Sequence, residues 1–197
     1  MTGGRTSTLP AWDAVVLAGG GGRRLGGVDK PAVAVGGTTL LDRVLAALGG
    51  VGRTVVVGPP RPTSRDVAWT REQPPGAGPA AALAAGLALA SAPAVVVLAA
   101  DLPFLDTETV RALRTAAGGA DGALLVDHEG REQLLAGCWR TTSLRAAVER
   151  AGDLTDRPLR AVLGGLDRRP VRVLRDGPAP WWDCDTPDDL RRAREHA

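Results

Sequence analysis

The residues that could do chemistry are concentrated in residues 15–30, VVLAGGGGRRLGGVDK. Four consecutive glycines at 19–22 follow a short apolar run. Such glycines cost conformational entropy on folding, so they are favoured where the backbone must approach a bulky anion and turn its N–H groups toward it. Arg23, Arg24 and Lys30 would add positive charge. The segment predicts a loop that binds polyphosphate; the alternative is a glycine-rich turn after an edge strand.

The glycine spacing excludes two common phosphate-binding motifs. The dinucleotide-binding pattern G-x-G-x-x-G does not fit, because Arg23, Arg24 or Leu25 stands where a glycine is required. The pattern G-x-x-x-x-G-K-[ST] fails because Gly27 or Val28 stands at the lysine position. A dehydrogenase-type dinucleotide site is therefore not expected.

Lys30 is the only lysine among 24 Lys and Arg residues, in a chain without tyrosine, isoleucine or asparagine. This composition indicates a G/C-rich genome in which surface lysines have become arginines. A compact ammonium and a planar guanidinium are not equivalent against a transferring phosphate. The retained lysine therefore supports a chemical role for this loop.

Asp101 offers a carboxylate at the end of a second apolar run, residues 94–100, just before Leu102-Pro103. A hard cation such as Mg²⁺ takes one or two carboxylates and completes its shell with water and phosphate oxygens. Asp101 is thus a candidate metal ligand, with capping of the following turn as the alternative. Asp183 or Asp185 could add a second ligand, although Asp185 could equally cap the last helix.

The elements that must position these residues follow from apolar periodicity and turn residues. Expected strands are 14–18, 53–57, 66–70, 94–100, 122–126, 134–139 and 171–174, and expected helices are 38–48, 79–90, 106–117, 142–151, 158–164 and 185–195. Their alternation predicts an α/β fold with a mostly parallel sheet covered by helices on both faces. Because ligands bind at the carboxyl ends of such strands, the glycine-rich segment and Asp101 are expected at one edge.

Size and charge narrow the class of protein. The 197 residues are expected to form a disordered lead-in, 1–12, and a single domain, 13–197, without repeats. The net charge of +2 and scattered basic residues do not indicate nucleic-acid binding. No apolar run approaches the length of a membrane span. Cys138 and Cys184 lack metal-type spacing and fit a reduced, cytoplasmic setting.

The other conspicuous side chains are expected to have structural or solvated positions. His128 lies in a polar turn, and His196 lies at a C-terminus that is expected to fray. Trp181 and Trp182 are expected to close a core, with stacking on a pterin or base as the alternative. Neither cysteine has a nearby group to activate it, so acyl transfer by a triad is not supported.

Four segments, taken together, resemble the signatures of the molybdenum cofactor guanylyltransferases and their nucleotidyltransferase relatives. In chain order they are LAGGGGRRLGGVDK, EQPPGAGPAAALAAGL, LAADLPFL and DCDTPDDL. The resemblance implies a three-layer, Rossmann-like nucleotidyltransferase fold. It also implies transfer of GMP from GTP to molybdopterin with release of pyrophosphate, dependence on Mg²⁺, and contact with molybdoenzyme maturation proteins.

The resemblance also assigns residues. It implies that the nucleotide is bound by Leu17, Ala18, Gly19, Gly20, Lys30, Glu72 and Asp101. Arg24 and Lys30 would neutralise the phosphates and Glu72 would contact the nucleoside. Asp101, with Asp185 as the second candidate ligand, would hold Mg²⁺. The oligomeric state stays open.

The sequence departs from the family pattern at several positions. Leu25 replaces the usual methionine, Pro31 follows the lysine, and Asp183 and Asp185 replace two asparagines. The segment REQLLAG lacks the Q-P-L often seen in the acceptor region. A cytidylyl- or sugar-nucleotidyltransferase, and a nucleotide-binding module that no longer catalyses, therefore remain as alternatives.

Overall fold

The computed structural model of the protein describes residues 9–19 and 28–197. These residues form a seven-stranded sheet in the order β5-β4-β1-β6-β8-β7-β9 and a separate hairpin, β2-β3. The strands of the sheet are β1 (Trp12–Leu17), β4 (Thr54–Val57), β5 (Ala68–Thr70), β6 (Ala94–Ala99), β7 (Gly122–Val126), β8 (Glu132–Arg140) and β9 (Arg168–Val171). The hairpin strands are β2 (Ala34–Val35) and β3 (Thr38–Thr39), and the helices are η2 (Lys30–Ala32, a 3-10 helix), α1 (Leu40–Ala46), α2 (Pro79–Leu87), α3 (Thr107–Ala116), α4 (Thr141–Ala151), α5 (Leu159–Leu163) and α6 (Pro187–Glu195).

The sheet is mostly parallel, as the alternation of elements predicts. β5, β4, β1 and β6 pair in parallel, and β9 pairs in parallel with β7. Only β8 among these seven strands runs the other way, between β6 and β7. Because β1 and β6 are parallel neighbours, the segments that follow them leave the sheet at the same edge.

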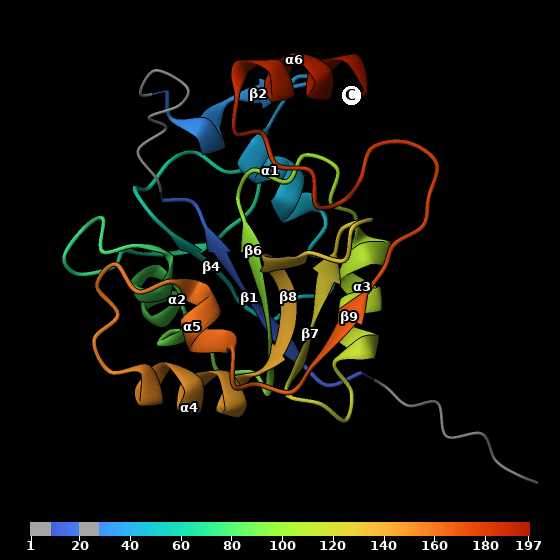
Figure 1. The fold of residues 1–197 in the computed structure, drawn as a ribbon. Helices are drawn as coiled ribbons and strands as arrows, with labels where there is room; N and C mark the ends of the chain where they lie inside the picture. Colours follow the sequence, from blue (N-terminus) through green and yellow to red (C-terminus); the bar gives the residue numbers. More distant parts are fainter. Residues whose placement is uncertain (1–8, 20–27) are drawn as a thin grey trace, which may run out of the picture.

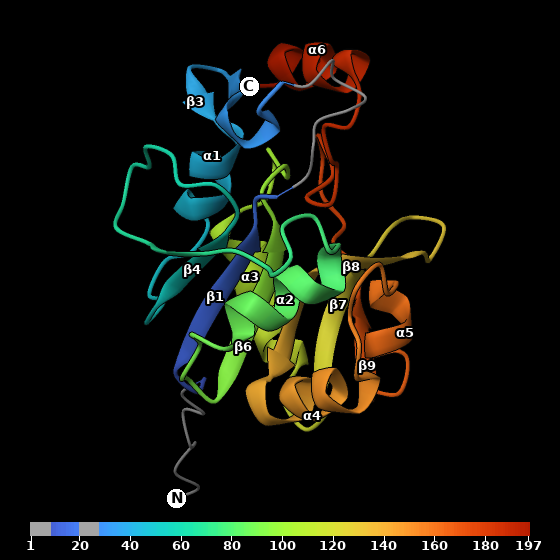
Figure 2. The same ribbon diagram turned by 90° about the vertical axis from the view of Figure 1, so that its left-hand side faces the viewer.

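Two helical layers cover the sheet (Figures 1 and 2), and β1 shows why. Its side chains alternate between the two faces, and all six of its residues are buried. Ala14 and Val16 belong to the core beneath α1 and α3. Val15 and Leu17 belong to the core beneath α2, α4 and α5. The three-layer α/β architecture expected from the sequence is confirmed.

Gly86 sets how closely α2 approaches the sheet. A Cβ built at this position would collide with the side chain of Val15 and lie 2.8 Å from Cγ2 of Val57. We expect Gly86→Ala to lower the free energy of unfolding by about 1–3 kcal/mol, because an overpacked core must shift. Urea unfolding would measure this, with Gly165→Ala, whose Cβ would meet nothing within 4 Å, as the control. Equal stability of the two variants would contradict the expectation.

Asp13 is a buried carboxylate that fixes the amino end of β1. It accepts hydrogen bonds from the backbone N–H groups of Arg53 at 2.8 Å, Ser91 at 2.6 Å and Ala92 at 2.9 Å. Burial by itself would raise the pKa of Asp13, but these hydrogen bonds outweigh it and lower the pKa below its usual value. The carboxylate thus joins β1 to the turns before β4 and β6.

Asp13 should make stability depend on pH in the acid range. A lowered pKa in the folded state contributes stability above the unfolded value, about 3.9, and this contribution is lost as the pH falls through the folded pKa. We expect Asp13→Asn to cost about 1–3 kcal/mol at neutral pH, because it presents a donor to backbone N–H groups. The difference from wild type should shrink below about pH 4. Chemical denaturation between pH 3 and 7 would measure it, and a pH-independent difference would contradict the assignment.

The structure corrects two expected boundaries. Trp12, placed in the lead-in by sequence, is the first residue of β1, where it is buried beneath the Arg114 guanidinium, 4.6 Å from the ring centre. Residues 1–8 of that lead-in lie outside the described residues. The last strand occupies Arg168–Val171 rather than 171–174, because pairing with β7 selects that register. Leu174, beyond it, is exposed.

A small layer stands over the carboxyl edge of the sheet and consists of η2, the hairpin and α6 (Figure 1). Val35 of β2 packs with Leu40 of α1 and with Cys184, Leu190 and Ala193 on and before α6. Thr186 is the N-cap of α6 and forms a reciprocal capping box with Asp189. None of the helices in the described ranges is long and apolar enough to cross a membrane.

Candidate active site

Lys30, Asp101 and Asp185 meet at the carboxyl edge of the sheet. Lys30 begins η2, Asp101 follows β6, and Asp185 precedes α6. The Lys30 ammonium forms an ion pair with Asp101 Oδ2 and lies 2.5 Å from Asp185 Oδ1. The side chains are 14%, 19% and 44% exposed, respectively. Three segments far apart in sequence therefore contribute to one polar cluster that solvent reaches from the Asp185 side.

The strand order brings the first two of these residues together. Leu17 at the end of β1 is in register with Ala99 at the end of β6. The Ala100 N–H then donates to the Leu17 carbonyl oxygen at 3.0 Å. Asp101 and the segment that follows β1 therefore start from adjacent strand ends, which is where ligands bind in parallel sheets.

The backbone after β1 is closely packed against the end of β4. The Ala18 N–H donates to the Val57 carbonyl oxygen at 2.8 Å. Gly58 has a φ of +149°, and a Cβ there would lie 2.7 Å from the Ala18 carbonyl oxygen. These contacts hold the end of β1 and the backbone of Ala18 at the edge of the sheet that also carries Asp101. Gly20 and Arg24, the other predicted loop residues, lie outside the described residues.

Lys30 interacts electrostatically with the carboxyl groups of Asp101, Asp183 and Asp185. Burial alone would lower the pKa of Lys30, but the carboxylates of Asp101 and Asp185 raise it above its usual value. Partial burial, together with Asp185 and Asp101, raises the pKa of Asp183, against the opposing effect of Lys30. Among the described residues, the carboxyl groups of Asp101, Asp183 and Asp185 therefore share the field of the Lys30 ammonium. Such a cluster stabilises additional positive charge.

Glu72 is a buried acidic residue with one oxygen that has no hydrogen-bond partner within the described ranges. It lies in the loop between β5 and α2 and is buried, with its Oε1 accepting from the Gly76 N–H at 2.9 Å. Its Oε2 is buried and has no hydrogen-bond partner among the described residues. A buried carboxylate oxygen without a donor is costly. Glu72 can therefore accept a hydrogen bond from a ligand, in keeping with the predicted nucleoside contact.

A family model described as "MobA-like NTP transferase domain" matches residues 14–171, which is most of the chain and runs from within β1 to the end of β9. The chain belongs to this family. It is therefore a nucleotidyltransferase, and the resemblance noted in the four sequence segments is confirmed.

Relatives match this MobA-like chain over nearly its whole length. The probable molybdenum cofactor guanylyltransferase of Natronomonas pharaonis is 32% identical, covering 92% of this chain and 96% of that protein. The molybdenum cofactor guanylyltransferase of Mesorhizobium japonicum is 32% identical, covering 91% and 92%. Both relatives carry guanylyltransferase names.

Solved structures share the fold. The molybdopterin-guanine dinucleotide biosynthesis protein A of Archaeoglobus fulgidus superposes with a TM-score of 0.71 at 26% identity, covering 93% of this chain and 97% of that one. The 2-C-methyl-D-erythritol 4-phosphate cytidylyltransferase of Thermus thermophilus gives a TM-score of 0.70 at 24% identity, covering 92% and 96%. The second likeness concerns the fold alone.

In this MobA-like domain, the cap of α6 is a residue other than Asp185. Thr186 and Asp189 form the capping box of α6, whereas Asp185 points to Lys30. Asp101 likewise contacts Lys30 rather than capping the turn that follows it. Both carboxylates therefore contact Lys30, and their role as metal ligands stays a prediction.

The cluster fits a hard divalent cation such as Mg²⁺. Asp101 Oδ1 is buried and has no hydrogen-bond partner within the described part of the chain. Over residues 9–19 and 28–197, no three His, Cys, Asp or Glu side chains form a ready-made metal site. One or two carboxylates, with phosphate oxygens and water as the remaining ligands, is the set that Mg²⁺ commonly takes. Asp101 and Asp185 match that set.

The aromatic residues near the site pack on one another. The Trp182 ring centre lies 5.6 Å from that of Phe104 and 6.3 Å from that of His196. Trp181 packs on the core beneath α1 and α3. His196, expected at a frayed end, is thus held by ring contacts. Trp181 thus closes a core, as the sequence analysis expected, and Trp182 packs on Phe104 and His196.

Sequence reasoning missed two arginines that shape this edge. Arg175 donates to Asp106 at 2.5 Å and to the Phe104 and Pro178 carbonyl oxygens at 2.8 Å. It thereby ties the segment before Asp183 to the segment after Asp101. Arg61 donates hydrogen bonds to the Ala18 carbonyl oxygen and to the Asp29 carboxylate. No spacing pattern identifies such arginines, because their partners are distant in sequence.

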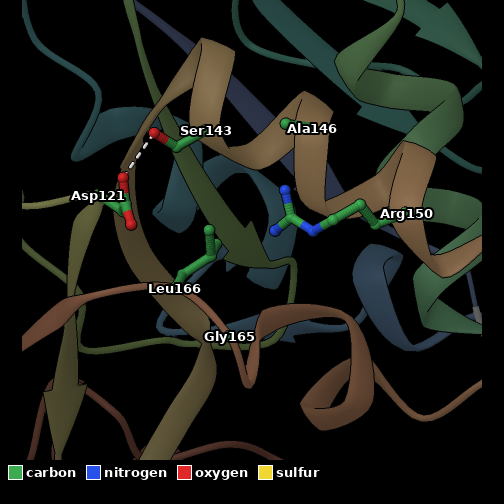
Figure 3. Close-up of a pocket in the computed structure, with 6 residues that line it drawn as sticks. All are labelled: Asp121, Ser143, Ala146, Arg150, Gly165 and Leu166. Atoms are coloured by element: carbon green, nitrogen blue, oxygen red, sulfur yellow. Dashed lines mark hydrogen bonds between the residues drawn. The ribbon is translucent and has the colours of Figure 1, made fainter.

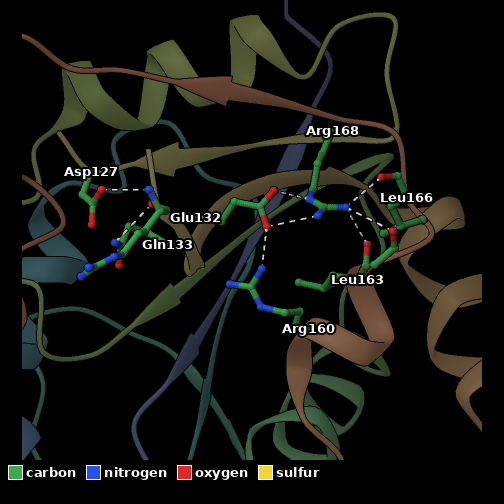
Figure 4. Close-up of polar contacts among 9 residues, drawn as sticks. Asp127, Glu132, Gln133, Arg160, Leu163, Leu166 and Arg168 are labelled. Atoms are coloured by element: carbon green, nitrogen blue, oxygen red, sulfur yellow. Dashed lines mark hydrogen bonds and ion pairs between the residues drawn. The ribbon is translucent and has the colours of Figure 1, made fainter. Parts of the chain in front are cut away.

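An ion-pair network and an open pocket lie away from this site. Glu132 pairs with Arg168, whose Nη1 also donates to the Leu163 carbonyl oxygen at 3.2 Å and so holds α5 against the sheet (Figure 4). An open pocket beside Asp121 and Ser143 lies at the amino end of β7 (Figure 3). That end is opposite the edge that carries Asp101. Cys184, by contrast, stands between Asp183 and Asp185 beside the site; it is buried, which raises its pKa to about 12 and keeps the thiol protonated.

Proposed function

We propose that this nucleotidyltransferase transfers GMP from GTP to the terminal phosphate of a molybdopterin-type acceptor and releases pyrophosphate. The observation that carries the proposal is the meeting of Lys30 with Asp101 at the adjacent ends of β1 and β6. The whole-chain relatives named molybdenum cofactor guanylyltransferases support the choice of nucleotide and acceptor. On this proposal the reaction takes place in the cytoplasm, and the product passes to proteins that mature molybdoenzymes.

The reaction requires positioning and charge stabilisation more than covalent work by the protein. A phosphate oxygen of the acceptor attacks the α-phosphorus of GTP in line with the departing pyrophosphate. Lys30 would leave its carboxylate partners to contact the phosphates, where it offsets the charge that builds on the leaving group. Backbone groups of Leu17, Ala18 and Gly19 would hold the guanine and ribose, and Glu72 would accept a hydrogen bond from the nucleoside.

Asp101 and Asp185 would hold Mg²⁺ in this proposal. When bound, the cation would supply positive charge to the nucleotide phosphates. Asp101 is the more enclosed of the two carboxylates, and its Oδ1 has no hydrogen-bond partner among the residues that the structure describes. The roles of Arg24 and Gly20 in phosphate and nucleotide binding stay predictions from the family resemblance.

Pyrophosphate release tests the proposal directly. Purified protein would be mixed with molybdopterin, Mg²⁺ and GTP, CTP, UTP or ATP in turn, and thermal shifts with the same nucleotides would report binding. We expect release and the largest shift with GTP. Preferred turnover of CTP or UTP would instead assign a cytidylyl- or sugar-nucleotidyltransferase. Binding of GTP without release in the presence of the acceptor would identify a non-catalytic module.

A further inference from the structure

Arg61, in the loop between β4 and β5, joins the two ends of the glycine-rich segment. Its Nη1 donates to the Ala18 carbonyl oxygen at 3.3 Å, just after β1. Its Nε and Nη2 donate to the two carboxylate oxygens of Asp29 at 3.1 and 2.9 Å, just before η2. The guanidinium carbon also lies 5.8 Å from the centre of the Trp69 ring. One arginine therefore connects the end of β1 to the residue beside Lys30.

The burial of Arg61 distinguishes this pair from an ordinary surface ion pair. The Arg61 side chain is only 8% exposed, although that of Asp29 is 54% exposed. Exposed ion pairs contribute little, because both side chains remain mobile. A buried guanidinium that binds a carboxylate with two parallel hydrogen bonds fixes both distance and direction. The contact is therefore suited to positioning.

Arg61 acts from a third segment of the chain. Ala18 and Asp29 flank the stretch 19–28, in which six of the ten residues are glycines. The side-chain hydrogen bonds of Arg61 connect these two flanking residues directly. Trp69 of β5 supports the guanidinium.

We infer that Arg61 is a positioning residue for nucleotide transfer. Through Ala18 and Asp29 it holds the end of β1 and Lys30 in a fixed relation, so that the triphosphate is aligned with its backbone and ammonium partners at once. This inference rests on the proposed function. Loss of alignment raises the KM for the nucleotide and lowers kcat, because small misplacements in a bound substrate slow reaction markedly.

The test compares Arg61→Met and Asp29→Asn with a matched control, Arg65→Met. Arg65 lies in the same loop but donates to the carbonyl oxygens of Leu45 and Leu48 at 3.2 and 3.0 Å, at the end of α1. We expect Arg61→Met to raise the KM for GTP about tenfold or more and to lower kcat, with the acceptor KM unchanged. Asp29→Asn should act in the same direction, and the double variant should add little to Arg61→Met.

The control and the conservative variant separate positioning from stability. Arg65→Met should lower the melting temperature and leave the KM for GTP unchanged. Arg61→Lys should restore only part of the loss, since a point charge cannot bind Asp29 with two parallel hydrogen bonds. If Arg61→Met does not fold, Asp29→Asn carries the test, because its side chain is largely in solvent.

Calorimetric titration with GTP and Mg²⁺ distinguishes failure of this inference from failure of the proposed function. Wild-type protein that binds and transfers the nucleotide, with Arg61→Met and Asp29→Asn indistinguishable from it, would overturn the positioning role alone. Wild-type protein that binds none of the four triphosphates would overturn the proposed function, and this inference with it.

Discussion

Replacing Lys30 by methionine is expected to lower kcat/KM for guanylyl transfer by about 100-fold or more, the cost of losing one preorganised electrostatic group. The ammonium is enclosed beside Asp101 and Asp185. The chain contains no second lysine that could take its place. Methionine preserves much of the length of the side chain and removes its charge. The effect should appear mainly in kcat, because negative charge develops on the leaving pyrophosphate between the bound ground state and the transition state.

Lys30→Arg should not restore this activity. A planar guanidinium is larger and directs its donors differently, and the side chain it would replace is only 14% exposed. Arg131→Met is the matched control, since Arg131 forms an exposed pair with Glu129 in the turn before β8. Steady-state pyrophosphate release would measure all three variants. Lys30→Met within threefold of wild type would exclude Lys30 from the reaction.

Asp101→Asn is the second large expected effect, again about 100-fold or more in turnover. The substitution keeps the shape of the side chain, removes its negative charge and replaces one carboxylate oxygen by an amide donor. Because Asp101 is the more enclosed candidate ligand, we also expect the variant to need a higher Mg²⁺ concentration for half-maximal activity. Activity measured against Mg²⁺ concentration at saturating GTP would show both changes.

The ion pair with Lys30 complicates this variant, and two controls resolve it. Asp188→Asn changes an exposed carboxylate on α6 that pairs with Arg191, and it should leave activity unchanged. The double variant Lys30→Met with Asp101→Asn should lose less than the product of the single losses if the two residues act as a unit. Asp101→Asn with nearly full Mg²⁺-dependent activity would exclude Asp101 as the metal ligand.

The sequence predicted the elements better than their ends. The strand at 122–126 was predicted at the residues where the structure has it, and the helix predicted over 106–117 begins with Asp106 as its N-cap. These signals are local, because a capping side chain bonds to backbone three residues away. The strand at 168–171 was placed about three residues late, since pairing with β7 and not local hydrophobicity selects its register. The β2-β3 hairpin was not predicted, because its strands have only two residues each.

The site shows the same division between local and distant information. Family-like segments identified Lys30, Asp101, Glu72 and Asp185, but they did not say which carboxylates face the lysine. The structure turns Asp185 away from the cap of α6 and toward Lys30. It also leaves one oxygen each of Glu72 and Asp101 without a partner among the described residues.

By itself, the sequence determined the α/β class, the strand ends that carry the polar groups, and the glycine-rich segment, because periodicity and glycine placement act over a few neighbouring residues. Only the tertiary structure decided that Arg61 joins Ala18 to Asp29 and that Asp185 meets Lys30 across 155 positions. Such pairs depend on the path of the whole chain through the sheet order, and no local pattern encodes that path.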